Sequence, residues 1–149
     1  MSPSNVSSPQ NMLQLDDMRA IIQSGDIQKL VSFAEVQGGA LQNYGLTTSQ
    51  IRLSFGQVRQ IEAMWSISGQ REQAERLLML LKPRIAYQAA RDNKDGSKLL
   101  RDILSAGIDV VFEDTPPGSD MAVERTTRFR RFTELFEALL AYHKVASIR

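Results

Sequence analysis

Apolar residues recur every three or four positions along most of the chain, which is the spacing of one helical face. The clearest stretch is 70–91, with apolar positions at Ala74, Leu77, Leu78, Leu81, Ile85 and Ala89. A second begins after Thr47, with Ile51, Phe55, Val58, Ile61 and Trp65. A third runs from about Met121 to Ala146, with Phe129, Phe132, Leu135, Phe136, Leu139 and Leu140. With shorter helical stretches at 16–24, at 26–44 and from about Ser97, the pattern predicts an all-α, compact bundle of about five to six helices.

Capping residues and glycines predict several helix boundaries. Asp26 is placed to cap the second helix, and Gly45 closes it. Thr47 and Gln50 have the spacing of a capping box, so the third helix is expected to begin there. The sequence "IDVVF" at 108–112 is consistent with either a continued helix or a short extended piece.

Four positions depart from the helical pattern. Gly38 and Gly39 are expected to weaken the second helix near its end. Pro83 lies opposite the apolar stripe of its helix, so we expect a bend there with a continuous core face. Glu62 falls inside an apolar arc, where it is expected to meet an arginine of a neighbouring helix.

The composition of the two ends predicts one domain and one tail. Residues 1–14 are rich in Ser, Pro, Asn and Gln, which predicts a flexible, disordered tail. Residues 15–149 are long enough for a single helical-bundle domain. Within it, "EDTPPGSD" at 113–120 is expected to be an exposed acidic loop.

Several classes of protein are disfavoured by what the sequence lacks. There is no cysteine, which excludes a disulfide framework and removes the commonest zinc ligands. The longest apolar run is 77–81, too short to span a membrane, and the N-terminus has no signal-peptide pattern. We therefore expect a cytoplasmic protein without a membrane partner.

The sequence also offers little catalytic chemistry. His143 is the only histidine, and its place on the apolar face of the last helix favours a packed, hydrogen-bonded core residue. The turn before Gly96 fails as a calcium loop, because its first position would be Arg91. We expect no enzymatic activity, no metal site and no cofactor.

The net charge of +1 conceals an uneven distribution. Residues 46–101 carry ten basic and five acidic side chains, whereas 102–119 carry four acidic side chains and no basic one. Such asymmetry is typical of a polyanion-binding face, although a solvated helix surface produces it as well.

One stripe of the fourth helix combines cations with an aromatic residue. Leu80, Arg84, Tyr87 and Arg91 follow one another at intervals of four, three and four residues. Guanidinium groups that clamp phosphates beside a tyrosine suit single-stranded nucleic acid. The alternative is that Leu80 and Tyr87 pack on another helix while the arginines pair with Glu62 or solvent.

The last helix begins with a second cluster, "RTTRFRRF", which contains Arg125, Arg128, Arg130 and Arg131. Cations at a helix N-terminus oppose the helix dipole, so this cluster needs either an external anionic partner or an acidic neighbour. The acidic loop at 113–120 is the internal candidate.

Three blocks of this sequence carry a family resemblance. They are "LTTSQIRLSFGQVRQIE", "LLKPRIAYQAAR" and "FTELFEALLAYHK", and the resemblance covers residues 46–91 and 132–144, well over a third of the chain. In this order they resemble the small subunit of the type III-A CRISPR effector, the Csm complex. The alternatives are the small subunit of the type III-B (Cmr) complex and a helical protein scaffold without RNA binding.

The resemblance implies a non-catalytic subunit of an antiviral, RNA-guided complex. Its expected partners are guide RNA, single-stranded target RNA, the backbone and large subunits, and copies of itself stacked into a filament. It contacts the RNA backbone without reading sequence. Combined with the clusters above, it implies an RNA-binding set made of Arg52, Arg59, Lys82, Arg84, Tyr87, Arg91, Arg128, Arg131 and Lys144. Among these, Tyr87 is expected to be a packing residue with its hydroxyl tied down.

Overall fold

The computed structural model describes residues 9–148, with side chains from Gln14 onward. All regular elements in this part of the chain are helices and none is a strand, which confirms the predicted fold class. The elements are α1 (Pro9–Met18), the π-helix η1 (Arg19–Gln23), α2 (Ile27–Asn43), α3 (Thr48–Trp65), α4 (Arg71–Asp92), α5 (Asp95–Val111) and α6 (Met121–Ser147).

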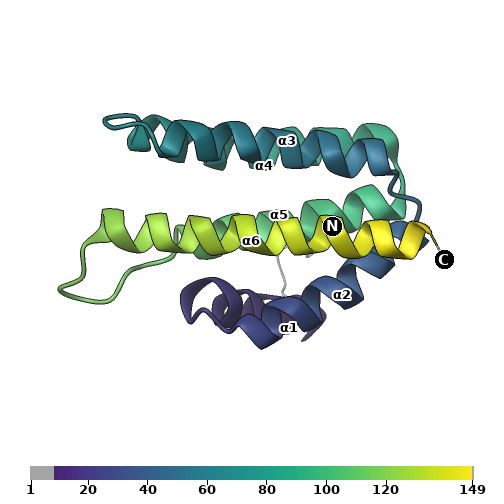
Figure 1. Ribbon diagram of the computed structural model, residues 1–149, viewed down its shortest axis with the longest axis horizontal. Coiled ribbons are helices and arrows are strands. Elements are labelled where there is room, and N and C mark those ends of the chain that lie inside the picture. The colour runs from purple at the N-terminus through teal and green to yellow at the C-terminus, as the bar shows by residue number, and fades with distance from the viewer. Residues whose placement is uncertain (1–8, 149) are drawn as a thin grey trace, which may run out of the picture.

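The helices form three layers (Figure 1). The pair α3 and α4 makes one outer layer, α5 and α6 make the middle layer, and α1, η1 and α2 make the other outer layer. A single apolar core fills the space on both sides of the middle layer. Its largest fully buried side chains include Phe132, Phe136, Ile51, Leu78 and Ile108.

The predicted boundaries of α2 and α3 are confirmed. The Asp26 carboxylate accepts a hydrogen bond from the backbone N–H of Lys29, at 3.0 Å. Thr47 and Gln50 form the reciprocal capping box, with bonds of 3.1 and 2.9 Å. Gly45 follows α2 with a φ of 91°, a conformation that favours glycine.

Other boundaries differ from the sequence prediction. Residues 9–14, expected in the flexible tail, belong to α1, and residues 1–8 lie outside the described residues. The fifth helix begins at Asp95 instead of near Ser97, because Asn93 reverses the chain with a φ of 51°. The ambiguous 108–112 stretch continues the helix to Val111, because the buried side chains Ile108, Val110 and Val111 pack in the core there.

The structure also places the residues that depart from the helical pattern. The helix α4 runs through Pro83, which is exposed opposite the buried stripe. Gly38 is buried against α6, and its lack of a side chain lets α2 and α6 approach closely there. The expectation for Glu62 is wrong: its side chain is 40% exposed and pairs with Arg59 of its own helix, at 2.9 Å.

Candidate nucleic-acid interface

The stripe on α4 lies on the surface, as the nucleic-acid interpretation requires. Tyr87 is 66% exposed and Leu80 47%, so neither packs on another helix, and the packing role expected for Tyr87 is wrong. Arg84, Tyr87 and Arg91 line a shallow groove of about 350 Å³ between α3 and α4. The Arg91 guanidinium carbon lies 5.9 Å from the centroid of the Tyr87 ring, which places a cation beside an aromatic face.

A second groove, between α3 and α6, brings together three predicted residues from distant parts of the sequence. Arg52 and Arg59 of α3 and Lys144 of α6 line a hollow of about 300 Å³. Its remaining lining includes Phe55 and Leu140, which belong to the predicted apolar stripes of their helices, and Ala141. Only the packing of α3 on α6 reveals that these residues share a groove.

The cations of the two grooves differ in how far they are neutralised internally. The Arg59 guanidinium lies 2.9 Å from the Glu62 carboxylate and 3.8 Å from the Glu137 carboxylate. Within residues 14–148, Arg52, Arg84 and Lys144 form no ion pair. These three cations therefore keep their charge available for an external anion.

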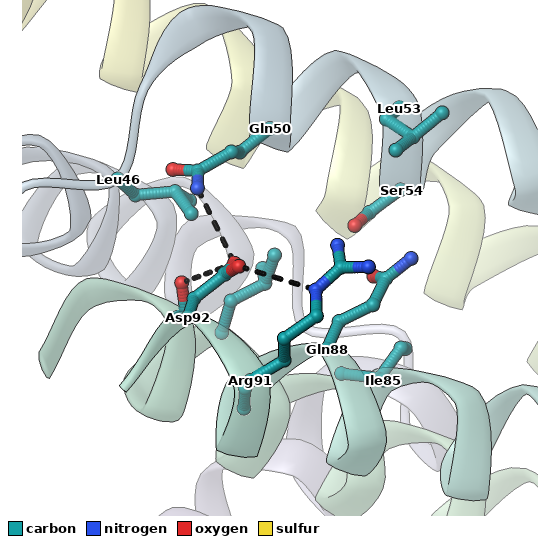
Figure 2. Close-up of a pocket in the computed structure, with 11 residues that line it drawn as sticks. Leu46, Gln50, Leu53, Ser54, Ile85, Gln88, Arg91 and Asp92 are labelled. Carbon is teal, nitrogen blue, oxygen red and sulfur yellow. Dashed lines mark hydrogen bonds and ion pairs between the residues drawn. The ribbon is translucent and has the colours of Figure 1, made fainter. Parts of the chain in front are cut away.

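Arg91 belongs to a polar junction at the end of α4 (Figure 2). The neighbouring Asp92 carboxylate accepts hydrogen bonds from Gln50 Nε2 at 3.3 Å and Ser97 Oγ at 3.2 Å. The Arg91 Nε lies 3.9 Å from the same carboxylate, at the limit of an ion pair. The junction ties α3, α4 and α5 around a small cavity of about 90 Å³, and it fixes the end of the helix that carries Arg91.

Lys82 lies apart from the other α4 cations. Its ammonium group pairs with Asp109 of α5, and its side chain is 30% exposed. Lys82 therefore links the outer layer of α3 and α4 to the middle layer. Because Asp109 of α5 neutralises its charge, Lys82 attracts an external anion less strongly than Arg84 does.

Arg128 and Arg131, both in the predicted RNA-binding set, donate to backbone carbonyls of the protein itself, and the burial of Arg128 is a correction to that set. Arg128 is buried, and its guanidinium donates to the backbone carbonyls of Glu113 at 2.7 Å and Asp114 at 3.3 Å. Arg131 donates to the carbonyls of Ile22 and Gln23, at 3.2 and 2.9 Å. Arg131 thus binds carbonyls at the C-terminal end of η1, and Arg128 binds carbonyls just beyond the C-terminal end of α5. At both places a cation complements the helix dipole.

The loop after α5 is held by a second cation. Arg19 donates to the Glu113 carboxylate at 2.8 and 3.0 Å, and Gln23 donates to it at 2.8 Å. The hydrogen bond from Arg19 is the main cause that holds the pKa of Glu113 below its ordinary value, and the bond from Gln23 adds to the effect. This half-buried carboxylate therefore ties the loop to η1 through Arg19 and Gln23.

His143 has the packed role that its position predicts. It is buried, and its Nε2 donates to the Leu46 carbonyl oxygen at 2.6 Å, which joins α6 to the loop before α3. In the described part of the chain no three potential metal ligands cluster together. No helix in that part is long and apolar enough to cross a membrane.

In the described part of the chain, exposed cations that form no ion pair lie on two sides of α3. A small helical bundle with such a surface is typical of a binding subunit. The sequence model of the family described as Csm2 Type III-A matches residues 24–149. The chain belongs to this family, as the three sequence blocks predict. It is a small subunit of the type III-A Csm complex, in which it assembles with the other Csm subunits. The matched family is that of type III-A and not type III-B. No curated protein and no solved structure matches the chain.

Proposed function

We propose that this subunit binds the backbone of guide RNA and single-stranded target RNA without reading sequence, as a non-catalytic part of antiviral interference. The observation that carries the proposal is the set of exposed cations around α3 that form no ion pair within residues 14–148, namely Arg52, Arg84 and Lys144. Arg91 and the exposed Tyr87 extend this surface along α4. Cationic side chains and an aromatic ring on which bases stack can bind any single strand, because phosphates and base faces are common to all sequences.

The salt dependence of RNA binding tests this proposal. Each phosphate that a cation neutralises on a single strand contributes about 0.7 to the fall of log affinity with log salt. Replacing Arg84 and Arg91 with glutamate is therefore expected to flatten the slope by about 1.4 and to weaken binding. The measurement is fluorescence anisotropy of a labelled oligouridine RNA titrated with the full chain over a range of salt concentrations.

The matched control reverses two exposed arginines outside both grooves, Arg76 and Arg130, and changes the net charge equally. We expect the control to retain most of the slope. Equal losses in the two variants would show a response to net charge alone. RNA binding that is absent even at low salt would leave the helical scaffold as the function.

We further propose that copies of the subunit stack head to tail beside the backbone subunits. An open stack needs two different contact surfaces on each copy. The outer layers provide apolar side chains on opposite sides of the bundle: Ile27, Val31 and Val36 on α2, and Met79 and Leu80 on α4. On α2, Ile27 and Val31 share one face and Val36 lies on another, so both faces of the helix expose apolar surface to a protein contact.

A charge placed on the α2 surface is expected to reduce the number of stacked copies. Val36 is 66% exposed, so Val36→Lys has little effect on the fold but would desolvate an ammonium group in any contact there. Native mass spectrometry of the assembled complex gives the copy number, with Gln60→Lys on α3 as the control. An unchanged copy number in Val36→Lys would exclude the α2 surface from the stack.

A further inference from the structure

The groove between α3 and α6 has an apolar floor as well as a cationic rim. Phe55, Leu140 and Ala141 line it beneath Arg52 and Lys144. Its volume, about 300 Å³, is at the lower end of the range for small-ligand pockets. A backbone phosphate alone requires no such floor, because phosphate binding uses charge and hydrogen bonds.

The floor offers a planar surface held in place by its neighbours. The Phe55 ring packs edge-on against Phe136, with centroids 5.2 Å apart and planes at 60°. The Arg59 guanidinium lies 5.3 Å from the centroid of Phe55 and is held by Glu62. Aromatic rings and guanidinium planes are the two protein surfaces on which unstacked RNA bases stack.

The rim provides positive charge on the same groove. Arg52 and Lys144, one from each helix, form no ion pair within residues 14–148, whereas Arg59 shares the carboxylates of Glu62 and Glu137. The net charge that faces the groove therefore comes from the first two residues. Charge and floor together fit a ligand that is flat and apolar at one end and anionic at the other.

We infer that this groove binds one whole nucleotide of the RNA, with the base on the Phe55 and Leu140 floor and a phosphate between Arg52 and Lys144. The inference rests on the proposed RNA binding and adds a base contact to it. An acidic peptide from another subunit would meet the same cations, but it has no nucleobase. Contact with a base face remains independent of sequence, because every base has one.

The test compares two small probes that differ only in the base, uridine 5′-monophosphate and ribose 5-phosphate. Nuclear magnetic resonance titration of the full chain measures both affinities and shows which amides shift. We expect uridine 5′-monophosphate to bind roughly fivefold or more tightly, since a stacked base contributes at least that factor. The largest shifts are expected around Phe55 and Ala141.

A variant that narrows the floor without changing any charge sharpens this test. Ala141 is exposed at the groove, so Ala141→Leu is expected to remove the preference for uridine 5′-monophosphate and leave ribose 5-phosphate binding unchanged. Ala90→Leu, an exposed position on α4 away from the groove, serves as the control. Equal affinity of the two probes for the unmodified chain, no binding of either, or shifts confined to α4 would each overturn the inference. The oligouridine salt titration decides RNA binding separately, so the two failures are distinguishable.

Discussion

Replacing Arg128 with alanine is expected to lower the free energy of unfolding by about 3 kcal/mol, although the residue lies in a cluster that looks like surface charge. Arg128 is 4% exposed, and its guanidinium donates to the carbonyls of Val111, Glu113 and Asp114. Alanine leaves these carbonyls without their donor and opens a cavity between α6 and the end of α5. Both effects destabilise the folded state.

Urea or thermal unfolding followed by circular dichroism measures this loss. For a chain of this length the expected decrease in melting temperature is roughly 10 °C. Arg130→Ala is the matched control, because Arg130 is exposed on the same turn of α6 and should change stability little. Equal and small effects of the two substitutions would contradict the buried role of Arg128.

The burial of Arg128 shows what the sequence lacked for predicting the role of the arginine cluster at the start of α6. A cation at the start of a helix is unfavourable in that helix, and this fact correctly indicates that a compensating partner exists. The sequence does not show that the partners are the carbonyl ends of α5 and η1, because those ends lie beside α6 only in the folded bundle. The sequence did indicate the acidic loop as an internal partner, but through its carboxylates. In the structure Arg128 instead binds backbone carbonyls of that loop.

Local rules predicted local features well. Thr47, Gln50 and Asp26 act through atoms within three residues, so their spacing determines the caps regardless of the tertiary fold. The apolar period of α4 likewise predicted its buried face. The exposure of Tyr87 could not be predicted in the same way, because a tyrosine beside an apolar stripe is compatible with a packed or an exposed ring. Its ring is exposed because no helix packs against that side of α4 in the described part of the chain.

The candidate site was predicted residue by residue, but its arrangement was not. Arg52 and Lys144 are separated by most of the chain, and their common groove exists because α3 packs on α6. The apolar floor is equally invisible in the sequence, where Leu140 and Ala141 are ordinary positions of an amphipathic helix. Cation patterns therefore indicated the chemistry, and only the packing of helices defined the two grooves.

The two adjacent glycines of α2 are expected to respond to alanine in opposite directions. Helix propensity alone predicts that each substitution stabilises the protein by roughly 0.5 to 1 kcal/mol. A Cβ atom at Gly39 meets nothing within 4 Å, so this gain should be observed there. A Cβ atom at Gly38 would lie 2.7 Å from the Cβ of Tyr142 and 3.0 Å from the backbone nitrogen of His143.

Gly38→Ala is therefore expected to destabilise the protein by roughly 2 kcal/mol, because the contacts it makes are with parts of α6 that cannot rotate away. Relief of the clash requires α2 and α6 to separate, which strains the hydrogen bond of His143 to Leu46 and the adjoining wall of the α3 and α6 groove. Unfolding in urea gives both free energies, and Gly39→Ala is the internal control. If both alanines stabilised the chain, the close approach of α2 and α6 would be wrong, and the groove geometry that depends on α6 would have to be revised with it.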